Sequence, residues 1–234
     1  MQNNTDLENI SNGAHNFLAK VVNYEFPDIS NILQLCADLT VEYDESHGVK
    51  HHLDVYQNAI LIFSDLNLLE DKSVSSGDYY HMLDIIIYSS LLHDTIDHKY
   101  PNNLEEKIRK VNEFLNLVDP KAGDIKWIMD NISYSKEAKF GYPIHPNKYV
   151  QLARDIVSDA DKLEALGEIG LRRCYEFCQV INPNANKSEL TKMVVQHCHD
   201  KLLKIKDQYI RTVPGKNFAT DRHQIIADFV SNNS

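Results

Sequence analysis

The chain has 234 residues, of which 43% are hydrophobic and 25% are charged, as is usual for a globular protein. Acidic side chains outnumber basic ones by 34 to 24, and the formal net charge of -10 disfavours binding to nucleic acid polymers or anionic membranes. The N-terminal residues do not resemble a secretory signal, and the most apolar stretch is shorter than the roughly 20 residues that span a bilayer. We therefore expect a soluble cytoplasmic protein with small-molecule partners, and we leave a homodimer open.

Helical periodicity recurs along the chain, whereas the signals for strands are weak. The breaks between periodic segments are short and do not resemble a flexible interdomain linker. The sequence therefore predicts an all-α fold in which residues 1–234 form a single helical domain. The expected helices cover residues 4–24, 27–42, 48–66, 78–96, 103–117, 122–134, 148–157, 159–181, 187–211 and 220–232.

The helix expected over 48–66 follows a segment rich in histidine, SHGVKHH. If Asp44 or Ser46 caps this helix, His51 points toward the protein interior and His52 is rotated about 100° away from it. His51 is therefore a candidate metal ligand. The alternative interpretation is a cluster of partly exposed histidines.

The apolar helix expected over 78–96 carries His93 and Asp94 near its C-terminal end. Burial of the apolar face brings this imidazole and this carboxylate into the core or beside it. Each group would be costly there unless it is paired, and a divalent cation satisfies both together. This pair is the second candidate for metal ligation.

The segment SDADKLEALG supplies two further acids at the start of the helix expected over 159–181. Asp159 could instead cap that helix and interact with the helix dipole. Asp161 lies deeper in the helix and is the better candidate for a metal ligand.

Three separated motifs, HHLDVYQNA, LLHDTIDHK and DADKLEALG, resemble in their order the H…HD…D signature of the HD-domain metal-dependent phosphohydrolases. With ISYSK and HCHDKLLKIKD added, the chain is similar over about residues 40–225 to a subgroup of small bacterial-type HD hydrolases. The resemblance implies a single-domain HD-type helical bundle that binds a divalent ion, with Mn²⁺ preferred over Mg²⁺, Co²⁺, Ni²⁺ or Fe²⁺. The metal ligands that it implies are those chosen above, namely His51, His93, Asp94 and Asp161.

The resemblance also implies catalytic and substrate-binding residues. Asp97 matches an acid that orients or deprotonates the attacking water, and it joins Asp94 in the catalytic centre; a salt bridge to Lys99 is the alternative for Asp97. For Lys136, a solvated basic surface is an equal alternative to substrate binding. The residues expected near the substrate are Lys99, Ser133, Ser135, Lys136 and Arg173.

Four positions depart from the pattern of the subgroup. Gly48 replaces the usual Asp after the first histidine, Val49 and Lys50 replace bulky aromatic residues, and Asp54 replaces a usual Arg. None of them is an expected metal ligand, so the departures concern contacts with the substrate near the mouth of the site.

The function implied by these motifs is divalent-metal-dependent hydrolysis of small phosphorylated substrates, with nucleotides expected. Both removal of pyrophosphate from a nucleoside triphosphate and a nucleotidase-like reaction fit the motifs. The alternative is a metal-stabilised sensor that binds a nucleotide without turnover.

The four cysteines are Cys36, Cys174, Cys178 and Cys198. The second and third lie one helical turn apart, upstream of the HCH segment at 197–199, so a zinc site is an alternative. We favour buried thiols, because no CxxC motif is present and the flanking residues have helical patterns.

Overall fold

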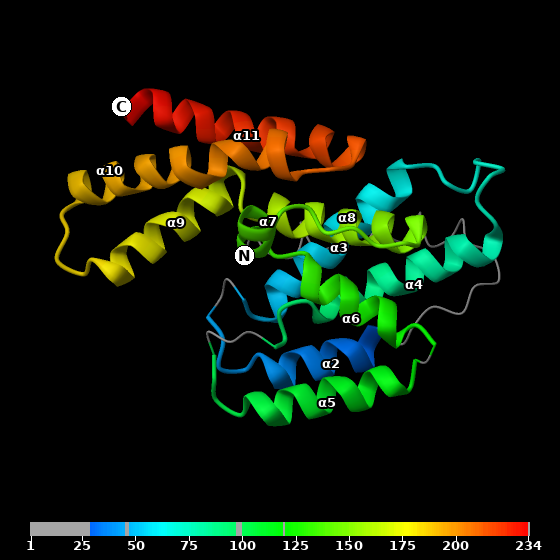
Figure 1. The fold of residues 1–234 in the computed structure, drawn as a ribbon. Coiled ribbons are helices and arrows are strands. Elements are labelled where there is room, and N and C mark those ends of the chain that lie inside the picture. Colours follow the sequence, from blue (N-terminus) through cyan, green and yellow to red (C-terminus); the bar gives the residue numbers. More distant parts are fainter. Residues whose placement is uncertain (1–28, 45–46, 97–99, 119, 234) are drawn as a thin grey trace, which may run out of the picture. The chain divides into compact units, whose positions relative to one another are not determined.

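The computed structural model describes residues 29–44, 47–96, 100–118 and 120–233, and every regular element in these ranges is helical (Figure 1). The predicted all-α fold is therefore confirmed. The helix expected over 4–24 lies outside the described residues. No helix in the described ranges is long and apolar enough to cross a membrane.

The chain forms two compact units, Met1–Val157 and Ser158–Ser234, and the boundary falls inside one helix, α8. The expectation of a single domain over 1–234 stays a prediction. The helices of the first unit are α2 (Ile29–Leu39), α3 (Val49–Asp65), α4 (Ser76–Leu92), α5 (Leu104–Asn116), α6 (Ala122–Asn131), α7 (Tyr134–Phe140) and the first part of α8 (Lys148–Leu163).

Helix α4 is the centre of the first unit, and it packs against α2, α3 and α6. Its sequence is apolar on nearly every face, and twelve of its seventeen residues are buried, which is the pattern of a core helix rather than an amphipathic surface helix. Ser75 begins the helix by accepting a hydrogen bond from the backbone N–H of Asp78. Helix α4 ends at Leu92, so His93 and Asp94 follow the helix rather than lying within a longer helix over 78–96.

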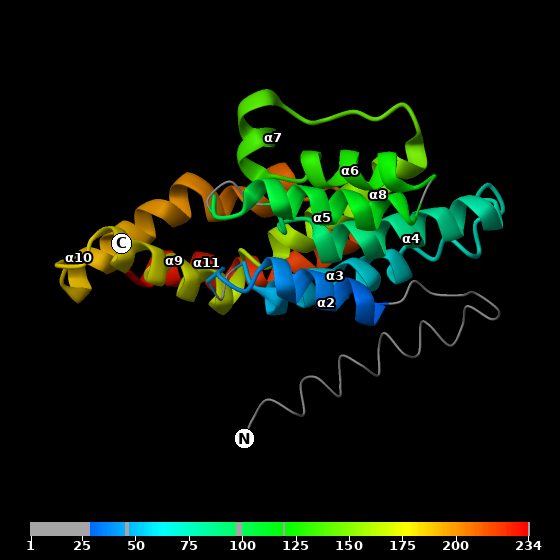
Figure 2. The ribbon, with the colours of Figure 1, turned by 90° about the horizontal axis from the view of Figure 1, so that it is seen from below.

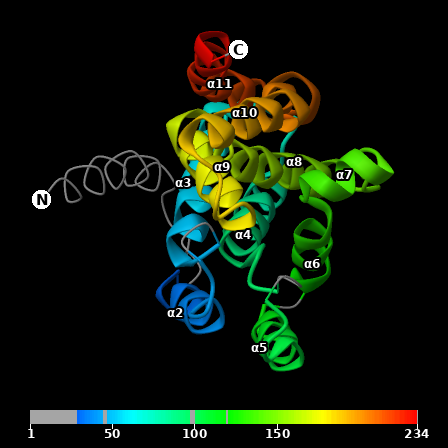
Figure 3. The same ribbon diagram turned by 90° about the vertical axis from the view of Figure 1, so that its left-hand side faces the viewer.

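The second unit contains the end of α8, then α9 (Gly167–Ile181), α10 (Lys187–His197), two π-helical segments, η1 (Cys198–Leu202) and η2 (Ile205–Tyr209), and α11 (Val213–Asn233). Helices α9, α10 and α11 pack against one another, and Figure 3 shows them grouped together. The expected helix over 187–211 therefore exists as α10 followed by wider helical turns.

The expected boundary between the helices over 148–157 and 159–181 was wrong. The expected break between 157 and 159 does not exist, because α8 continues to Leu163. Asp159 lies inside this helix and accepts hydrogen bonds from the backbone N–H groups of Arg211 and Thr212, at 2.8 Å and 2.7 Å. Its carboxylate therefore anchors the turn before α11 instead of capping a helix.

Helix α11 begins at Val213, before the expected start of the helix over 220–232. Proline is compatible with the first turn of a helix, where no intrahelical hydrogen bond needs its missing N–H, and Pro214 lies there. The Thr212 hydroxyl accepts a hydrogen bond from the Gly215 N–H at 3.0 Å, so this side chain caps the N-terminus of α11.

Helix α7 was not predicted, because its seven residues are too few to show periodicity. Helix α6 ends at Asn131, and the Ser133 side chain accepts a hydrogen bond from the backbone N–H of Lys136 to start α7. After α7 an extended segment leads back to α8 (Figure 2).

Candidate functional site

His51, His93 and Asp94 lie together in the first unit. Helix α3 places His51, and the end of α4 places His93 as its C-terminal cap. The two Nε2 atoms are 3.1 Å apart, and Asp94 Oδ2 lies 3.6 Å from His93 Nε2 and 4.0 Å from His51 Nε2. Two ring nitrogens and one carboxylate oxygen therefore converge on a small volume.

Both histidines of this cluster are buried, with residue exposures of 3% for His51 and 6% for His93. The predicted inward orientation of His51 is therefore confirmed, and a partly exposed histidine cluster does not describe this residue. The Asp94 side chain is 36% exposed, so the cluster has one solvated side.

The ring of His93 is oriented by the helix that precedes it. Its Nδ1 lies 2.9 Å from the Ser90 carbonyl oxygen, which can only accept a hydrogen bond, so Nδ1 carries the proton and donates it. In the neutral ring, Nε2 then carries the lone pair that faces His51 and Asp94. Metal-binding histidines commonly have this arrangement, in which a backbone carbonyl fixes the tautomer.

The expected contrast between His51 and His52 is not observed, because His52 is fully buried as well. Its ring centroid lies 4.8 Å from that of His93 and 5.8 Å from that of His51. Burial lowers the pKa of His52 well below its ordinary value, and the neighbouring His93 and His51 lower it further. His52 is therefore a neutral core residue that packs behind the cluster.

The chemistry of the cluster fits a divalent cation. Imidazole nitrogen and carboxylate oxygen are ligands for Mn²⁺, Fe²⁺, Co²⁺, Ni²⁺ and Zn²⁺, and the charge of the cation would balance that of Asp94. His51 and His93 belong to a group of side chains that could hold a metal ion.

Asp161 lies on α8 in the second unit, four residues after the boundary with the first. Its backbone carbonyl accepts a hydrogen bond from Glu164 N at the end of this helix. The neighbouring Lys162 is buried and donates a hydrogen bond to the Ser158 hydroxyl. The role of Asp161 as a fourth ligand stays a prediction.

The expected substrate-binding residues are distributed over several places. Ser133, Ser135 and Lys136 lie at the start of α7 in the first unit, where Lys136 Nζ donates to the Asp130 carbonyl at 2.9 Å. Arg173 is half-buried on α9 in the second unit. Asp97, the expected base, and Lys99 lie outside the described residues.

The segment before α3 differs from the expectation. Gly48, not Asp44 or Ser46, is the N-terminal cap of α3; Ser46 itself lies outside the described residues. Asp44 instead accepts a hydrogen bond from the Tyr100 hydroxyl at 2.5 Å, and its other oxygen lies 3.1 Å from His47 Nδ1. The chain thus supplies a carboxylate to His47 from Asp44, while position 48 has none.

Two residues near the cluster, Tyr43 and Lys107, belong to none of the motifs found in the sequence. Tyr43 donates a hydrogen bond to the carbonyl of Thr95, directly after Asp94, at 3.0 Å. Lys107 is buried on α5 with its ammonium nitrogen 4.3 Å from the centre of the Tyr43 ring. Their significance depends on contacts between distant segments, which periodicity does not reveal.

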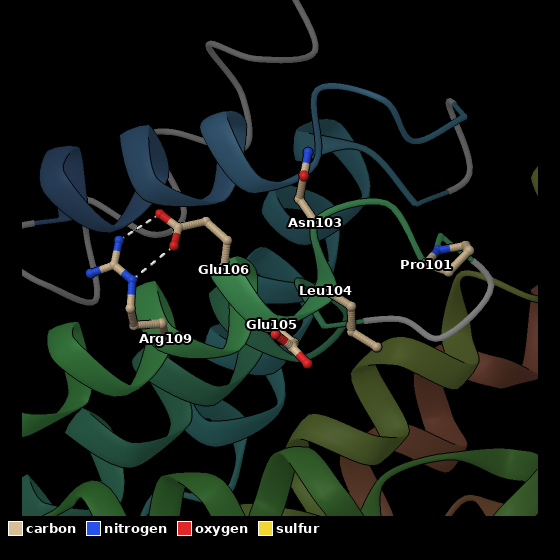
Figure 4. A pocket seen from close by; sticks show the side chains of 6 residues that line it. All are labelled: Pro101, Asn103, Leu104, Glu105, Glu106 and Arg109. Atoms are coloured by element: carbon tan, nitrogen blue, oxygen red, sulfur yellow. Dashed lines mark hydrogen bonds and ion pairs between the residues drawn. The ribbon is translucent and has the colours of Figure 1, made fainter.

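A pocket at the start of α5, shown in Figure 4, has a lining that differs from the histidine cluster. Its charged lining consists of Glu105, Glu106 and Arg109, and Arg109 donates to Glu106 and to Glu113. A cation already engaged by two carboxylates is a poor partner for a phosphate. This pocket therefore does not add a phosphate-binding group to the site.

The cysteines of the second unit lie on α9 and η1. Burial, with a smaller contribution from the nearby Cys178, raises the pKa of Cys174 to about 12 and that of Cys198 to about 11. Among the described residues, no group of side chains placed to hold a metal ion includes a cysteine. The interpretation as buried thiols is therefore the better supported one.

Comparison with known proteins gives relatives of the same fold. No protein-family model matches the chain. Over 149 residues the chain is 25% identical to the uncharacterized protein YpgQ of Bacillus subtilis, covering 62% of this chain and 69% of YpgQ. The crystal structure of YpgQ in complex with ADP has a TM-score of 0.60 and 18% identity, covering 88% of this chain and 95% of that one.

Two further crystal structures are similar. A protein from Lactobacillus plantarum has a TM-score of 0.64 and 20% identity, covering 89% of this chain and 96% of its own. An HD-superfamily hydrolase from Bacillus thuringiensis has a TM-score of 0.55 and 21% identity, covering 87% of this chain and 93% of its own. The chain therefore has the helical fold of the HD-superfamily hydrolases, as its histidine and aspartate motifs predict.

Proposed function

We propose that the protein is a divalent-metal-dependent phosphohydrolase that acts on small phosphorylated substrates, with nucleotides as the substrate class. The observation that carries this proposal is the pair of buried ring nitrogens, His51 Nε2 and His93 Nε2, that face each other at 3.1 Å beside the Asp94 carboxylate. Imidazole nitrogens and a carboxylate gathered in this way are ligand types that divalent transition metals bind. The HD-type fold and the order of the sequence motifs support the same chemistry.

His51, His93 and Asp94 would hold the ion, and Asp161 of the DADKLEALG motif is proposed as the fourth ligand. A divalent ion at such a site polarises a phosphoryl oxygen, neutralises developing charge and makes a bound water more acidic. Manganese is the proposed ion, because it accepts both imidazole and carboxylate ligands.

Asp97 is proposed to orient the attacking water and to accept its proton. It lies three residues after Asp94 in the sequence, and a general base contributes typically 10²–10⁴-fold to the rate. Lys99, Lys136 and Arg173 are proposed to bind phosphate oxygens, for which Arg173 can use two parallel N–H groups. Ser133 and Ser135 are proposed to lie near the substrate with them.

Nucleotides are the proposed class because the relative YpgQ was crystallised with ADP. Either a nucleoside triphosphate that loses pyrophosphate or a monophosphate that loses phosphate would fit this proposal. Tests with purified protein should measure phosphate and pyrophosphate release from ribo- and deoxyribonucleotides with Mn²⁺, Mg²⁺ or Co²⁺. Release that depends on the metal and is abolished by a chelator is the expected result.

A sensor that binds a nucleotide without hydrolysing it is the second candidate. One observation favours it: Gly48 and Asp54 depart from the sequence pattern of the subgroup that the chain resembles, and Asp54 lies 2.6 Å from Lys50 Nζ. The Lys50 ammonium, which could otherwise bind a phosphate, is thereby paired with the Asp54 carboxylate. Nucleotide binding measured by calorimetry, with no product from any nucleotide and metal, would favour the sensor over the enzyme.

A further inference from the structure

Tyr43 links three segments of the first unit that are far apart in the sequence. Its ring stacks on Tyr100 with ring centroids 4.0 Å apart and an interplanar angle of 16°. Its hydroxyl donates a hydrogen bond to the carbonyl of Thr95 at 3.0 Å. The third segment is α5, which contributes Lys107.

Lys107 holds the ring of Tyr43 from another direction. Its side chain is buried, with 7% exposure of the residue, and Nζ has no hydrogen-bond partner among the described residues. The ammonium lies 4.3 Å from the centre of the Tyr43 ring. A desolvated cation interacts more strongly with an aromatic face than an exposed one, so Lys107 favours one orientation of this ring.

The contact with Thr95 is relevant to the candidate metal site because Thr95 directly follows Asp94 in the sequence. Helix α4 ends at Leu92, so Asp94 lies in a turn outside the regular helical hydrogen bonds. On the helix side, the backbone N–H and the hydroxyl of Thr95 both donate to the Leu92 carbonyl, at 3.1 Å and 2.7 Å. On the other side, the carbonyl of Thr95 accepts the hydrogen bond from Tyr43.

Asp94 has weaker restraints of its own. Its carboxylate is 36% exposed and lies 3.6 Å and 4.0 Å from the two histidine nitrogens, distances that are too long for hydrogen bonds. The direction of this carboxylate therefore depends on the backbone that carries it. Fixing the turn over residues 92–95 fixes the approach of Asp94 to the cation.

We propose that Tyr43 is a positioning residue that holds Asp94 in place for binding a divalent cation, with Lys107 holding the ring of Tyr43. This inference rests on the proposed function, because it assumes that Asp94 is a metal ligand. Partners that orient the ligands of a metal typically change its affinity by 10–100-fold when they are removed. The lost hydrogen bond should therefore appear in metal affinity.

The test compares Tyr43→Phe with Tyr149→Phe in the full-length protein. Tyr43→Phe removes one hydroxyl and keeps the stacked ring and the face toward Lys107. Tyr149→Phe makes the same chemical change at a matched contact, since the Tyr149 hydroxyl donates to the Ser73 carbonyl at 3.1 Å. Calorimetric titration of chelator-treated protein with Mn²⁺ alone measures the dissociation constant, and thermal unfolding of each apoprotein measures stability.

The expected result is that Tyr43→Phe raises the Mn²⁺ dissociation constant about 10-fold, the lower end for such partners, while Tyr149→Phe leaves it unchanged. Both apoproteins should unfold within a few degrees of the wild type. An unchanged dissociation constant in Tyr43→Phe, or an equal rise in both variants, would overturn the proposal. If Tyr43→Phe folds poorly, Lys107→Met decides instead, and an affinity equal to that of the wild type would count against the proposal.

The wild-type titration separates this inference from the proposed function. Wild-type protein that binds no Mn²⁺ would overturn both. Wild-type protein that binds Mn²⁺, shows the expected difference between the tyrosine variants and hydrolyses no nucleotide would support the role of Tyr43. In that case only the proposed catalytic activity would fail.

Discussion

The first unit contains two buried polar clusters that differ in how their charges are satisfied. Arg154 is fully buried on α8, and its guanidinium donates to the Asn131 carbonyl, to Glu137 and to Asp155 at 2.8–3.0 Å, while it lies over the ring of Tyr142. The positive guanidinium is therefore paired directly with the carboxylates of Glu137 and Asp155. In the cluster of His51, His93 and Asp94, two ring nitrogens lie beside one carboxylate, and none of the three residues is a lysine or an arginine.

Under the proposed function, the difference separates a structural network from a binding site. The Arg154 cluster joins the end of α6, α7 and the loop after α7 to α8 through interactions within the protein. The histidine cluster is proposed to bind a cation from solution. Substitutions should therefore affect stability at the first cluster and metal binding at the second.

The largest effect is expected for Asp94→Ala. This change removes a ligand and the negative charge that balances the cation, so metal content should fall from near one ion per chain to background, and hydrolysis should fall with it. Elemental analysis after gel filtration checks the metal. Because the Asp94 side chain is 36% exposed, the apoprotein should keep its unfolding temperature. Equal metal content in wild type and variant would mean that the cluster is not the metal site.

The next largest effect is expected for Asp97→Asn, which separates water activation from metal binding. Asparagine keeps the shape of the side chain but cannot accept the proton, so kcat should fall by about 10²–10⁴-fold with KM nearly unchanged. Metal content should stay at the wild-type level. A variant that hydrolyses the best nucleotide at the wild-type rate would limit Asp97 to a structural role such as a salt bridge to Lys99.

Arg154→Met should affect stability instead. The change leaves Glu137 buried without its cation, and breaking a buried ion pair in this way costs about 3–5 kcal/mol. Urea unfolding of the apoprotein measures this loss. Arg109→Met is the control, because Arg109 also binds two glutamates but at an exposed position, where little change is expected. Equal losses in both variants would contradict the distinction between buried and exposed pairs.

The smallest effect is expected for the double variant Cys174→Ser and Cys178→Ser, which extends the comparison to the second unit. If these residues are buried thiols, metal content should not change, and stability should fall by about 1–2 kcal/mol because two hydroxyls replace less polar groups. Zinc analysis and urea unfolding measure the two quantities. Loss of bound zinc from the double variant would instead reveal a metal site on α9.

The all-α fold and the candidate ligands could be predicted from the sequence because both depend on local patterns. Apolar residues on every face of 78–92 predict a buried helix, and a polar pair at its end predicts a special environment. The inward orientation of His51 follows from the period of one helix. Boundaries were predicted less well: α7 is too short for periodicity, and Asp159 is held inside α8 by residues more than 50 positions away.

The sequence by itself determined which residue types and motifs are present, and through helical periodicity it determined which side chains face the core. The tertiary structure decided what those side chains meet. The facing nitrogens of His51 and His93 are separated by 42 residues, and Tyr43 meets Thr95 across 52. Such contacts depend on how helices pack rather than on local propensity, so nothing in the residues around Tyr43 or Lys107 predicts a link to Asp94.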